Sequence, residues 1–557
     1  MKQTRLAVWS LFTLLVIPET YGAQYRVVEL PVAELGTSTF PTAINSIGDI
    51  TVNMQLQYNP YIDTSLIDFE SSTVINNLTN LDGVRGGDLN NQDYLWLYSY
   101  ITSNSQNLFF QQIANLNGYV DNASTTELIH GFDTFDFVSD EYINSAAVNV
   151  RSINNSGSVV GTSQDGFYNL TIFTDDAQSL TYVVNDFYSR AFAKIDDRTT
   201  ALPPPDTTGG GLSDAYDINV NNQVVGVGTT QFMDSSFQTA VDSCLGDEAC
   251  LRSLSIQLAG NVGTVAQRRG IIWQLDDSGN LTDTFTLGML IEPDSSDTSI
   301  YSSTAVAIND NGIAVGVSPA FYQNTTSLTT AAAIYIDDQV TTINLDEEAL
   351  ASKATDINNN NIMVGSTTKR VLGVTRTKFF VHDVDSNLTI FPDDFSHGSS
   401  SNALSINNQN MVVGYGESET ILTTRRTEGF IYDYRNDIFS GLNSLTECNS
   451  PYYIAQANAI NDNNEIAATA LVSAPAKNIK GEIIYDELGA TTNVDQVVAV
   501  KLVPIEGGSI DNCDAYEEVP ERQGASMSIW MLLFGMFSLA CKGLIRKRNL
   551  TGFQKTK

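Results

Sequence analysis

The chain has 557 residues and a formal net charge of −35 at pH 7, because 64 Asp and Glu residues face only 29 Lys and Arg residues. A surface this acidic repels phosphate backbones, so a nucleic-acid partner is excluded. The hydrophobic content of 42% is that of a globular protein with a substantial core. Five cysteines fit an oxidising compartment without making a disulfide-dense scaffold.

The first 23 residues have the composition of a signal peptide. Lys2 and Arg5 lie at its head, and the apolar stretch runs from Leu6 to Ile17. The small residues Gly22 and Ala23 offer a cleavage point. A basic head, a short apolar stretch and small residues direct a chain to export. We therefore predict that residues 1–23 are removed and that the body of the protein lies outside the cytoplasm.

A short motif recurs seven times in the remaining chain. Each copy has Ile followed by Asn, and each has Gly or Asn four positions after the Ile. The pairs are Ile44-Asn45, Ile153-Asn154, Ile218-Asn219, Ile308-Asn309, Ile357-Asn358, Ile406-Asn407 and Ile460-Asn461. Five copies also have Gly eight positions after the Ile, namely Gly161, Gly226, Gly316, Gly365 and Gly414.

This pattern is typical of a β-hairpin. Gly and Asn enter the left-handed backbone region at least cost, as the last position of a tight turn requires. Pairs such as Val224-Val225 and Val412-Val413 follow the turn and favour a strand. The side chain of the Asn after each Ile is expected to cap its own turn. Turn geometry accounts for these asparagines, so we predict a structural role for them.

A second apolar segment follows the hairpins and extends each repeat to four strands. Examples are the segments 270–273, 333–336, 379–382 and 429–432, each followed by a polar turn and another short strand. The last four Ile anchors are 49, 49 and 54 residues apart, within the range of propeller blades. We predict an all-β fold, a β-propeller of about seven four-stranded blades within residues 24–505. An eighth, decayed copy at Asp88–Asp93 is the alternative, and the strand Tyr25–Leu30 is expected to complete the last blade near Val497–Val503.

Irregular spacing between the earlier repeats indicates insertions at about residues 54–150 and 229–268. The second contains Cys244 and Cys250, and its composition allows a short helix held by these two cysteines. Cys541 lies in the apolar C-terminal segment and is expected to be unpaired. The other four cysteines allow three connectivities, of which we favour Cys244–Cys250 with Cys448–Cys513. Long insertions on a rigid scaffold are where function usually lies, so we expect the functional residues there.

The C-terminal region is predicted to hold a membrane anchor. Residues 506–526 read as a linker, and residues 527–545 form an apolar segment followed by Arg546-Lys547-Arg548. Nineteen helical residues cover roughly 28 Å, which is about one hydrocarbon core. The basic residues 546–557 should remain in the cytoplasm and leave the acidic body outside.

The repeat resembles bacterial extracellular repeats named for a His-Ala-Phe tripeptide, most closely between Arg269 and Ser318. The tripeptide is absent, and Lys378-Phe379-Phe380 and Glu428-Gly429-Phe430 stand in its place. The whole chain resembles an uncharacterised envelope family classed as a domain of unknown function. Its tail, with Gly524-Ala525-Ser526, resembles the glycine-led GlyGly-CTERM sorting signals, which implies an intramembrane sorting protease as a partner and either release or a permanent anchor.

Few residues suggest chemistry. Only three histidines exist, and none has a metal-ligand spacing. No Gly-x-Ser-x-Gly elbow and no phosphate-binding loop occurs in the sequence. Asp383, Asp385 and Asn387 alternate like the start of a calcium loop, although an ordinary turn between strands explains them better. No other cofactor is indicated.

These observations favour a non-catalytic binding or scaffold module at the bacterial envelope, with an unidentified protein or glycan as its partner. The competing hypothesis is a propeller hydrolase that acts on extracellular polymers through carboxylates at the central mouth. Two carboxylates about 5–10 Å apart beside an aromatic-lined funnel would favour the hydrolase.

Overall fold

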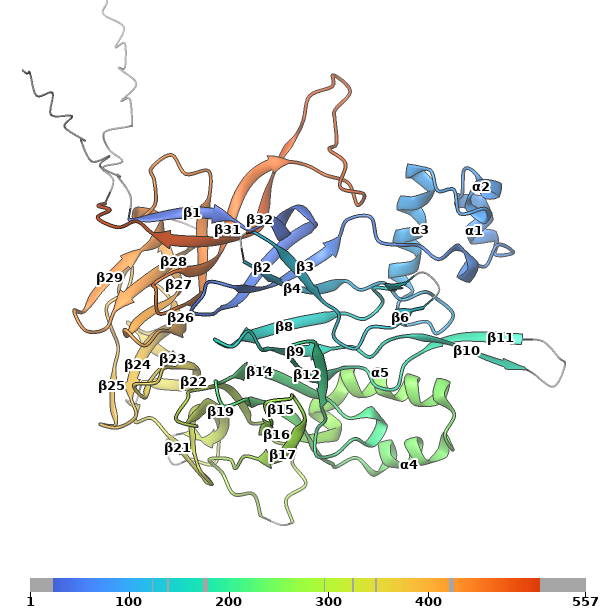
Figure 1. Cartoon of the computed structure of the whole chain (residues 1–557). Helices are drawn as coiled ribbons and strands as arrows, with labels where there is room; N and C mark the ends of the chain where they lie inside the picture. Colours follow the sequence, from blue (N-terminus) through green and yellow to red (C-terminus); the bar gives the residue numbers. More distant parts are fainter. Residues whose placement is uncertain are drawn as a thin grey trace, which may run out of the picture. The chain divides into compact units, whose positions relative to one another are not determined.

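Seven antiparallel four-stranded sheets account for most of the computed structural model. It describes residues 24–510, apart from 123, 138–139, 174–178, 295, 323–324, 346–347 and 420–424. The sheets are the blades of a β-propeller (Figure 1), as predicted. In chain order they are blade 1 (β2-β3-β4-β5), blade 2 (β8-β9-β12-β13), blade 3 (β14-β15-β16-β17), blade 4 (β18-β19-β20-β21), blade 5 (β22-β23-β24-β25), blade 6 (β26-β27-β28-β29) and blade 7 (β30-β31-β32-β1).

Each blade begins with a strand at the propeller axis and continues outward. The innermost strands are β2 (Gly36–Ile44), β8 (Val148–Ile153), β14 (Ser213–Ile218), β18 (Thr304–Ile308), β22 (Ala349–Ile357), β26 (Ser401–Ile406) and β30 (Tyr453–Ile460). The second strands are β3 (Ile50–Gln57), β9 (Val159–Ser163), β15 (Gln223–Phe232), β19 (Ala314–Phe321), β23 (Ile362–Val371), β27 (Met411–Glu419) and β31 (Ile466–Pro475). The seven Ile anchors therefore end the seven innermost strands.

The outer half of each blade contains the second apolar segments of the repeats. The third strands are β4 (Leu116–Asp121), β12 (Arg190–Ile195), β16 (Ala266–Leu275), β20 (Leu328–Ile336), β24 (Val374–Asp383), β28 (Arg426–Asp433) and β32 (Asn493–Pro504). The outermost strands are β5 (Thr126–Ile129), β13 (Arg198–Leu202), β17 (Leu281–Thr286), β21 (Gln339–Thr342), β25 (Leu388–Ile390), β29 (Ile438–Gly441) and β1 (Tyr25–Glu29).

The N-terminal strand closes the ring as predicted. Strand β1 pairs antiparallel with β32, with Tyr25 opposite Pro504 and Glu29 opposite Val500. Blade 7 thus combines strands from both ends of the propeller domain, so that the first and last segments cannot separate without breaking a sheet. Closure also removes an open sheet edge that would invite aggregation.

The alternative of an eighth blade is wrong, because the segment Asp88–Asp93 leads into a helix. The side chain of Asn90 accepts a hydrogen bond from the backbone N–H of Asp93, at 2.9 Å, and caps α3 (Asn91–Ser103). The segment has Leu89 in place of Ile and no β-branched pair after its turn. Without those strand signals, an Asn that precedes a helix-compatible run acts as an N-cap.

The apolar core lies between neighbouring blades. One cluster joins Val160 and Ala193 of blade 2 to Ala215, Ile271 and Trp273 of blade 3, and others repeat this arrangement around the ring. The described part of the insertions adds two separate cores, one within the blade 1 insertion and one within the blade 3 insertion. The blades therefore stabilise one another, whereas the insertions have their own hydrophobic contacts.

The predicted left-handed turn position is present in all seven hairpins. The residue four positions after each Ile has a φ between 56° and 90°. These residues are Gly48, Gly157, Asn222, Gly312, Asn361, Asn410 and Asn464. The Asn and Gly preference of the repeat is therefore explained by backbone conformation.

A β-bulge explains the five glycines eight positions after the Ile. Every innermost strand skips at least one residue in its pairing with the second strand, as between Ala305 and Ala307 in blade 4. A Cβ atom on Gly316 would lie closer than 3.0 Å to the backbone oxygen of Thr304, and the other four glycines meet the same obstacle. The bulge brings two backbones too close together for a side chain.

Replacing Gly316 with alanine is therefore expected to lower the free energy of unfolding by about 2 kcal/mol, because the β18–β19 bulge must open. Gly288→Ala is the matched control, since its Cβ would meet only Val340, at 3.6 Å. Urea denaturation of both variants measures the difference. Equal midpoints would show that the bulge is not the constraint on Gly316.

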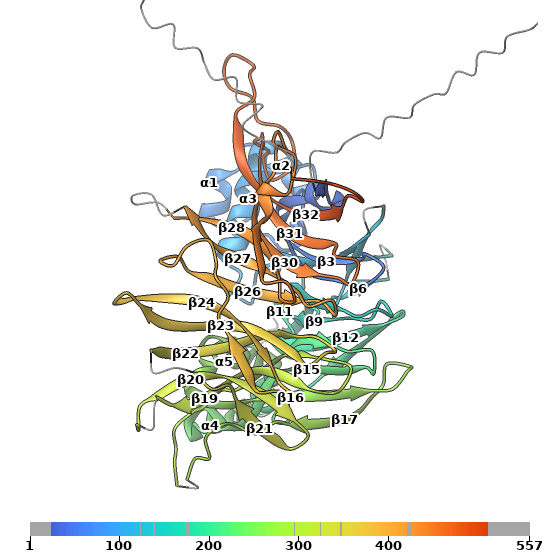
Figure 2. The ribbon, with the colours of Figure 1, turned by 90° about the vertical axis from the view of Figure 1, so that its left-hand side faces the viewer.

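The two faces of the propeller differ. One face carries the short Ile-Asn turns and is called the Asn-ring face; the opposite face is called the insertion face, because the long connections emerge there (Figure 1, right-hand side). Viewed from the Asn-ring face, the helices lie behind the blades (Figure 2). The insertion face carries α1 (Ser72–Asn77), α2 (Leu81–Arg85), α3, α4 (Ser235–Ser243), α5 (Glu248–Val265) and the hairpins β6–β7 (Phe135–Asp136, Glu141–Tyr142) and β10–β11 (Tyr168–Phe173, Ser179–Val184).

Both predicted insertions contain helices, although only the second was expected to. No helix within residues 24–510, outside the gaps named above, is long and apolar enough to cross a membrane. The predicted signal peptide, the segment 527–545 and the basic tail lie outside the described residues.

Candidate functional site

The seven repeat asparagines form a closed ring of hydrogen bonds at the Asn-ring face. In each turn the side-chain oxygen accepts from the backbone N–H groups two and four positions later, at 2.9–3.2 Å. This confirms the predicted turn cap. The side-chain NH2 group of each Asn donates to the backbone oxygen of the corresponding Asn in the next blade, at 2.9–3.4 Å.

The blade-to-blade bond was not predicted, and it gives the repeat Asn a second structural role. Asn461 of blade 7 donates to Asn45 of blade 1, at 2.9 Å, so the ring has no open link. All seven asparagines are buried. Six of these NH2 groups donate two hydrogen bonds and that of Asn154 donates one, so the turns and the ring engage most of the hydrogen-bonding capacity of these amides.

The central mouth at this face holds a cavity of about 170 Å³ lined by the same turns. Three carboxylates line it, those of Asp217, Asp310 and Asp462. Asp462 accepts from both the backbone N–H and the side-chain amide of Asn408, at 2.8 and 2.9 Å. Asp310 accepts from the backbone N–H of Val220, at 3.2 Å, and from the side-chain amide of Asn359, at 2.6 Å. Among the described residues lining this mouth, none is aromatic. The carboxylates join neighbouring turns in a narrow polar mouth.

Asp217 of the mouth and Asp356 both lie on innermost strands, β14 and β22. Asp217 accepts from the backbone N–H of Ile308, at 2.9 Å, and Asp356 accepts from that of Ile406, at 2.8 Å. Each therefore links its own blade to the next. Burial, followed by the negative charge of Asp217, raises the pKa of Asp356 to about 7, and burial also raises the pKa of Asp217. These carboxylates therefore hold neighbouring blades together.

A hollow on the insertion face, here called the aromatic cleft, has a volume of about 480 Å³. It is built by the insertion at residues 58–115, the β5–β8 connection and the β10–β11 insertion, all from blades 1 and 2. Its lining residues are Tyr61, Asp63, Leu66, Gln111, Gln112, Thr134, Phe135, Asp136, Phe137, Ile143, Ser145, Phe167, Tyr168, Asn169 and Val183.

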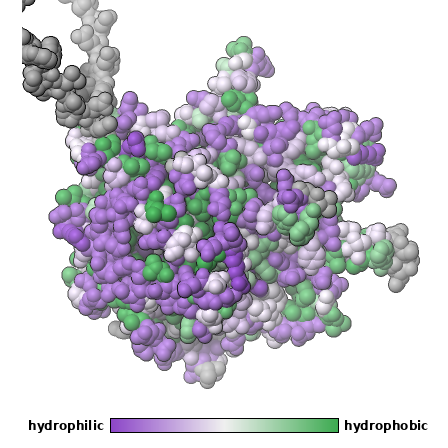
Figure 3. Space-filling model, in the orientation of Figure 1, coloured by the Kyte–Doolittle hydropathy of each residue, from purple (hydrophilic) through white to green (hydrophobic). Residues whose placement is uncertain are grey.

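Several aromatic rings of the cleft are open to solvent. Tyr61 is 71% exposed and Phe137 is 88% exposed. The hairpin β10–β11, which protrudes to the right in Figure 3, adds the exposed side chains of Tyr168, Ile172 and Phe173. Exposed aromatic side chains grouped around a hollow mark a binding surface, whereas scattered ones would need no explanation.

A second hollow of about 270 Å³ adjoins the aromatic cleft and shares Asp63, Leu66 and Gln111 with it. Here the two insertions touch. The backbone N–H of Val183 donates to the oxygen of Leu108, at 2.6 Å, and the rings of Phe109 and Tyr182 lie 4.9 Å apart. The two hollows therefore form one elongated surface across two insertions.

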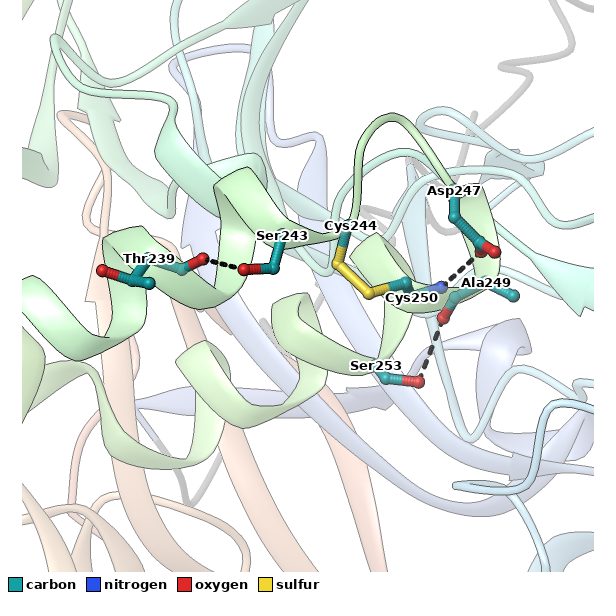
Figure 4. The surroundings of a disulfide bond; sticks show 7 residues. All are labelled: Thr239, Ser243, Cys244, Asp247, Ala249, Cys250 and Ser253. Atoms are coloured by element: carbon teal, nitrogen blue, oxygen red, sulfur yellow. Dashed lines mark hydrogen bonds between the residues drawn. A yellow bond between two sulfur atoms is a disulfide. The ribbon is translucent and has the colours of Figure 1, made fainter.

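The structure contains the predicted Cys244–Cys250 disulfide, with the Cα atoms 5.6 Å apart (Figure 4). It joins the end of α4 to the start of α5, where Asp247 caps the helix by accepting from the N–H of Cys250, at 2.9 Å. Next to it, the buried Arg252 lies over Phe167, 5.2 Å from the ring centroid. Burial lowers the pKa of Arg252 to about 10. The disulfide-linked helices thus support an aromatic residue of the cleft.

The calcium candidates lie in the β24–β25 turn. One oxygen of Asp383 accepts from the backbone N–H groups of Asp385 and Ser386, and Asp385 accepts from the side chain of Asn361. Asn387 supplies a left-handed residue with a φ of 53°. Within the described part of the chain, no group of three His, Cys, Asp or Glu side chains could hold a metal ion. Calcium remains a prediction, which thermal melts with calcium and with a chelator would test.

The other predicted sites fall partly or wholly outside the described residues. Cys448 is disulfide-bonded, but its predicted partner Cys513 is not among them. The same holds for Gly524, Ala525 and Ser526. The aromatic cleft, in contrast, was missed at the level of single residues. The signal was present in the stretch from Phe132 to Phe137, where three Phe residues alternate with Asp and Thr.

Comparison with solved structures gives matches of low similarity. A puromycin-hydrolyzing peptidase of Mycobacterium tuberculosis matches with a TM-score of 0.37 and 9% identity, over 86% of this chain and 56% of that one. The β-propeller domain of the Trilobed protease from Pyrococcus furiosus matches with a TM-score of 0.33 and 10% identity, over 68% and 87%. A Trypanosoma rangeli sialidase matches with a TM-score of 0.29 and 10% identity, over 64% and 54%.

This chain therefore spans just over half the length of the first of these proteins. No curated protein matches the sequence significantly. A family model covers residues 3–540, which is nearly the whole sequence. The chain therefore belongs to the family described as protein of unknown function DUF3466.

Proposed function

We propose that this protein is an exported, envelope-anchored binding module that captures its ligand on the insertion face. The observation that carries the proposal is the difference between the two faces. The Asn-ring face has short turns whose polar groups bond to one another, whereas the insertion face carries the aromatic cleft and the protruding hairpin. Rigid scaffolds commonly place binding residues on such long connections.

The path of the chain brings both ends of the propeller domain to one face. Strand β1 begins opposite Pro504, and Leu502 pairs with Ile466, which follows the Asn461 turn. The backbone N–H of Ile505 donates to the oxygen of Gln24, at 2.8 Å. Both ends of the propeller therefore lie at the Asn-ring face of blade 7. The aromatic cleft therefore lies on the side of the propeller opposite both of these ends.

Photo-crosslinking in the native bacterium tests the proposal. A photoreactive residue at Leu488, 93% exposed on the insertion between β31 and β32, is expected to give adducts. The matched control is Ile47, 74% exposed in the turn of the Asn-ring face, which is expected to give none. Mass determination of the mature protein purified from the same cells gives both of its termini. Adducts at Ile47 alone, or a protein retained in the cytoplasm, would contradict the proposal.

A hydrolase of extracellular polymers is the second candidate. Its supporting observation is that Asp63 and Asp136 both line the aromatic cleft. The hydrolase would therefore use carboxylates of this cleft and not those of the central mouth. Paired carboxylates beside a sugar-binding surface are what glycoside hydrolysis requires. The candidate predicts release of reducing ends from a polysaccharide by the wild-type protein and loss of that activity in both Asp63→Asn and Asp136→Asn. Polymer binding without chain cleavage would contradict the hydrolase and agree with the binding module.

A further inference from the structure

We propose that the ligand of the aromatic cleft is a neutral glycan chain, an inference that rests on the binding function proposed above. The cleft and the adjoining hollow together form an elongated surface, which fits a polymer better than a compact metabolite. Its chemistry has three parts, namely exposed aromatic faces, open hydrogen-bond acceptors and the absence of basic side chains.

The aromatic side chains provide flat apolar platforms. Tyr61 and Phe137 are mostly exposed, and Phe109 in the adjoining hollow is 48% exposed. The apolar faces of pyranose rings, which present C–H groups, stack on such rings while their hydroxyls remain at the edge. Aromatic rings contribute a large contact area at a small cost in conformational entropy. Rings spread over both hollows can hold successive sugar units.

Two hydrogen-bond acceptors of the cleft are open. One oxygen of Asp63 accepts from the N–H and hydroxyl of Ser65, at 2.9 and 2.7 Å, and the side-chain NH2 of Gln112 donates to the oxygen of Phe110, at 3.1 Å. Among the described residues, no donor bonds to the second oxygen of Asp63 or to the side-chain oxygen of Gln112. A sugar hydroxyl both donates and accepts, so a glycan can satisfy these acceptors together with open donors in the lining, whereas a peptide backbone brings one carbonyl for each N–H.

Charge restricts the glycan to one without acidic groups. The described lining of the two hollows contains no Lys, Arg or His, and it includes the carboxylates of Asp63, Asp68 and Asp136. The whole chain carries a net charge of −35. An anionic polymer would therefore meet repulsion both in the cleft and on approach. A neutral glycan needs no charge compensation and can use every acceptor.

Affinity electrophoresis of the full chain in mild detergent tests the inference. The gels contain a neutral polysaccharide, namely dextran, a β-glucan, xylan or galactomannan, or the acidic polymer alginate. We expect at least one neutral polymer to retard the protein and alginate not to do so. The double variant Tyr61→Ala/Phe137→Ala is expected to weaken retardation at least about tenfold, because the two most exposed platforms are lost. Their exposure makes a folding defect unexpected, and a thermal melt verifies this.

Phe285→Ala is the matched control, because this ring is 54% exposed on the outermost strand of blade 3, away from the cleft. Its retardation should equal that of the wild type. No retardation by any neutral polymer, or equal retardation of the double variant, would overturn the inference. Protein adducts from a photoreactive residue at Phe137 would overturn it in favour of a peptide ligand. Adducts at Leu488 without glycan binding would support the proposed binding function and contradict only the proposal that the ligand is a neutral glycan.

Discussion

Replacing Asn358 with alanine is expected to lower the free energy of unfolding by about 4 kcal/mol, because buried hydrogen-bond partners lose their counterpart. The side-chain oxygen of Asn358 accepts from the N–H groups of Asn360 and Ile362, both at 3.0 Å. Its NH2 group donates to the backbone oxygen of Asn407, at 2.9 Å, and to the side chain of Asn410, at 2.8 Å. Alanine removes the turn cap and the link to blade 6 together.

The control is Asn360→Ala in the same turn. Asn360 is exposed and its side chain donates to Asn408 and Asn410. Water can replace these bonds, so the loss should stay below about 1 kcal/mol. Urea denaturation monitored by tryptophan fluorescence and by circular dichroism measures both variants. If Asn358→Ala changed stability no more than Asn360→Ala, the ring would not be a source of stability.

The second large effect is a dependence of stability on pH that is produced by Asp356. Burial and the charge of Asp217 raise the pKa of Asp356 to about 7 in the folded protein. Between about pH 4 and pH 7 the folded carboxyl keeps a proton that the unfolded carboxyl has lost, so stability from this group falls as pH rises. Asp356→Asn should match the wild type below about pH 4 and exceed its free energy of unfolding by about 4 kcal/mol at pH 8.

Asp383→Asn in the same blade provides a control of opposite sign. Burial tends to raise the pKa of Asp383, but hydrogen bonds from Ser386 and Asp385 hold it below its ordinary range. Its contribution to stability is therefore present at neutral pH and lost in acid. Asp383→Asn should cost stability at pH 7 and converge on the wild type at low pH. Parallel curves of unfolding free energy against pH for wild type and Asp356→Asn would refute the assignment to Asp356.

Much of the architecture could be predicted because the residue types of the repeat depend on the local backbone conformation. A left-handed turn position admits Gly or Asn at low cost, so Gly312 and Asn361 identify the same conformation in different blades. Alternating apolar residues around each turn then indicate paired strands. The closing strand Tyr25–Glu29 was predictable because a strand without its own hairpin needs a partner elsewhere.

The predictions were weaker where the pattern had several physical solutions. Asp88–Asp93 resembles the turn of a repeat, yet an Asn with three following polar residues can also cap a helix, and the surrounding insertion forms one. The helices α1–α3 were missed because their apolar residues pack mainly against one another and against connecting segments, among them Ile479 between β31 and β32, with no repeat to reveal them.

The sequence by itself determined the blade, its turns and the number of Ile-Asn hairpins, because these depend on contacts between residues close in the chain. Only the tertiary structure showed that the amide of Asn461 reaches Asn45 across the closure of the ring. It also brought Tyr61, Phe137 and Tyr168 to one cleft from separate insertions. Such contacts join residues more than 30 positions apart, and nothing in local spacing specifies which insertions will meet once the ring has closed.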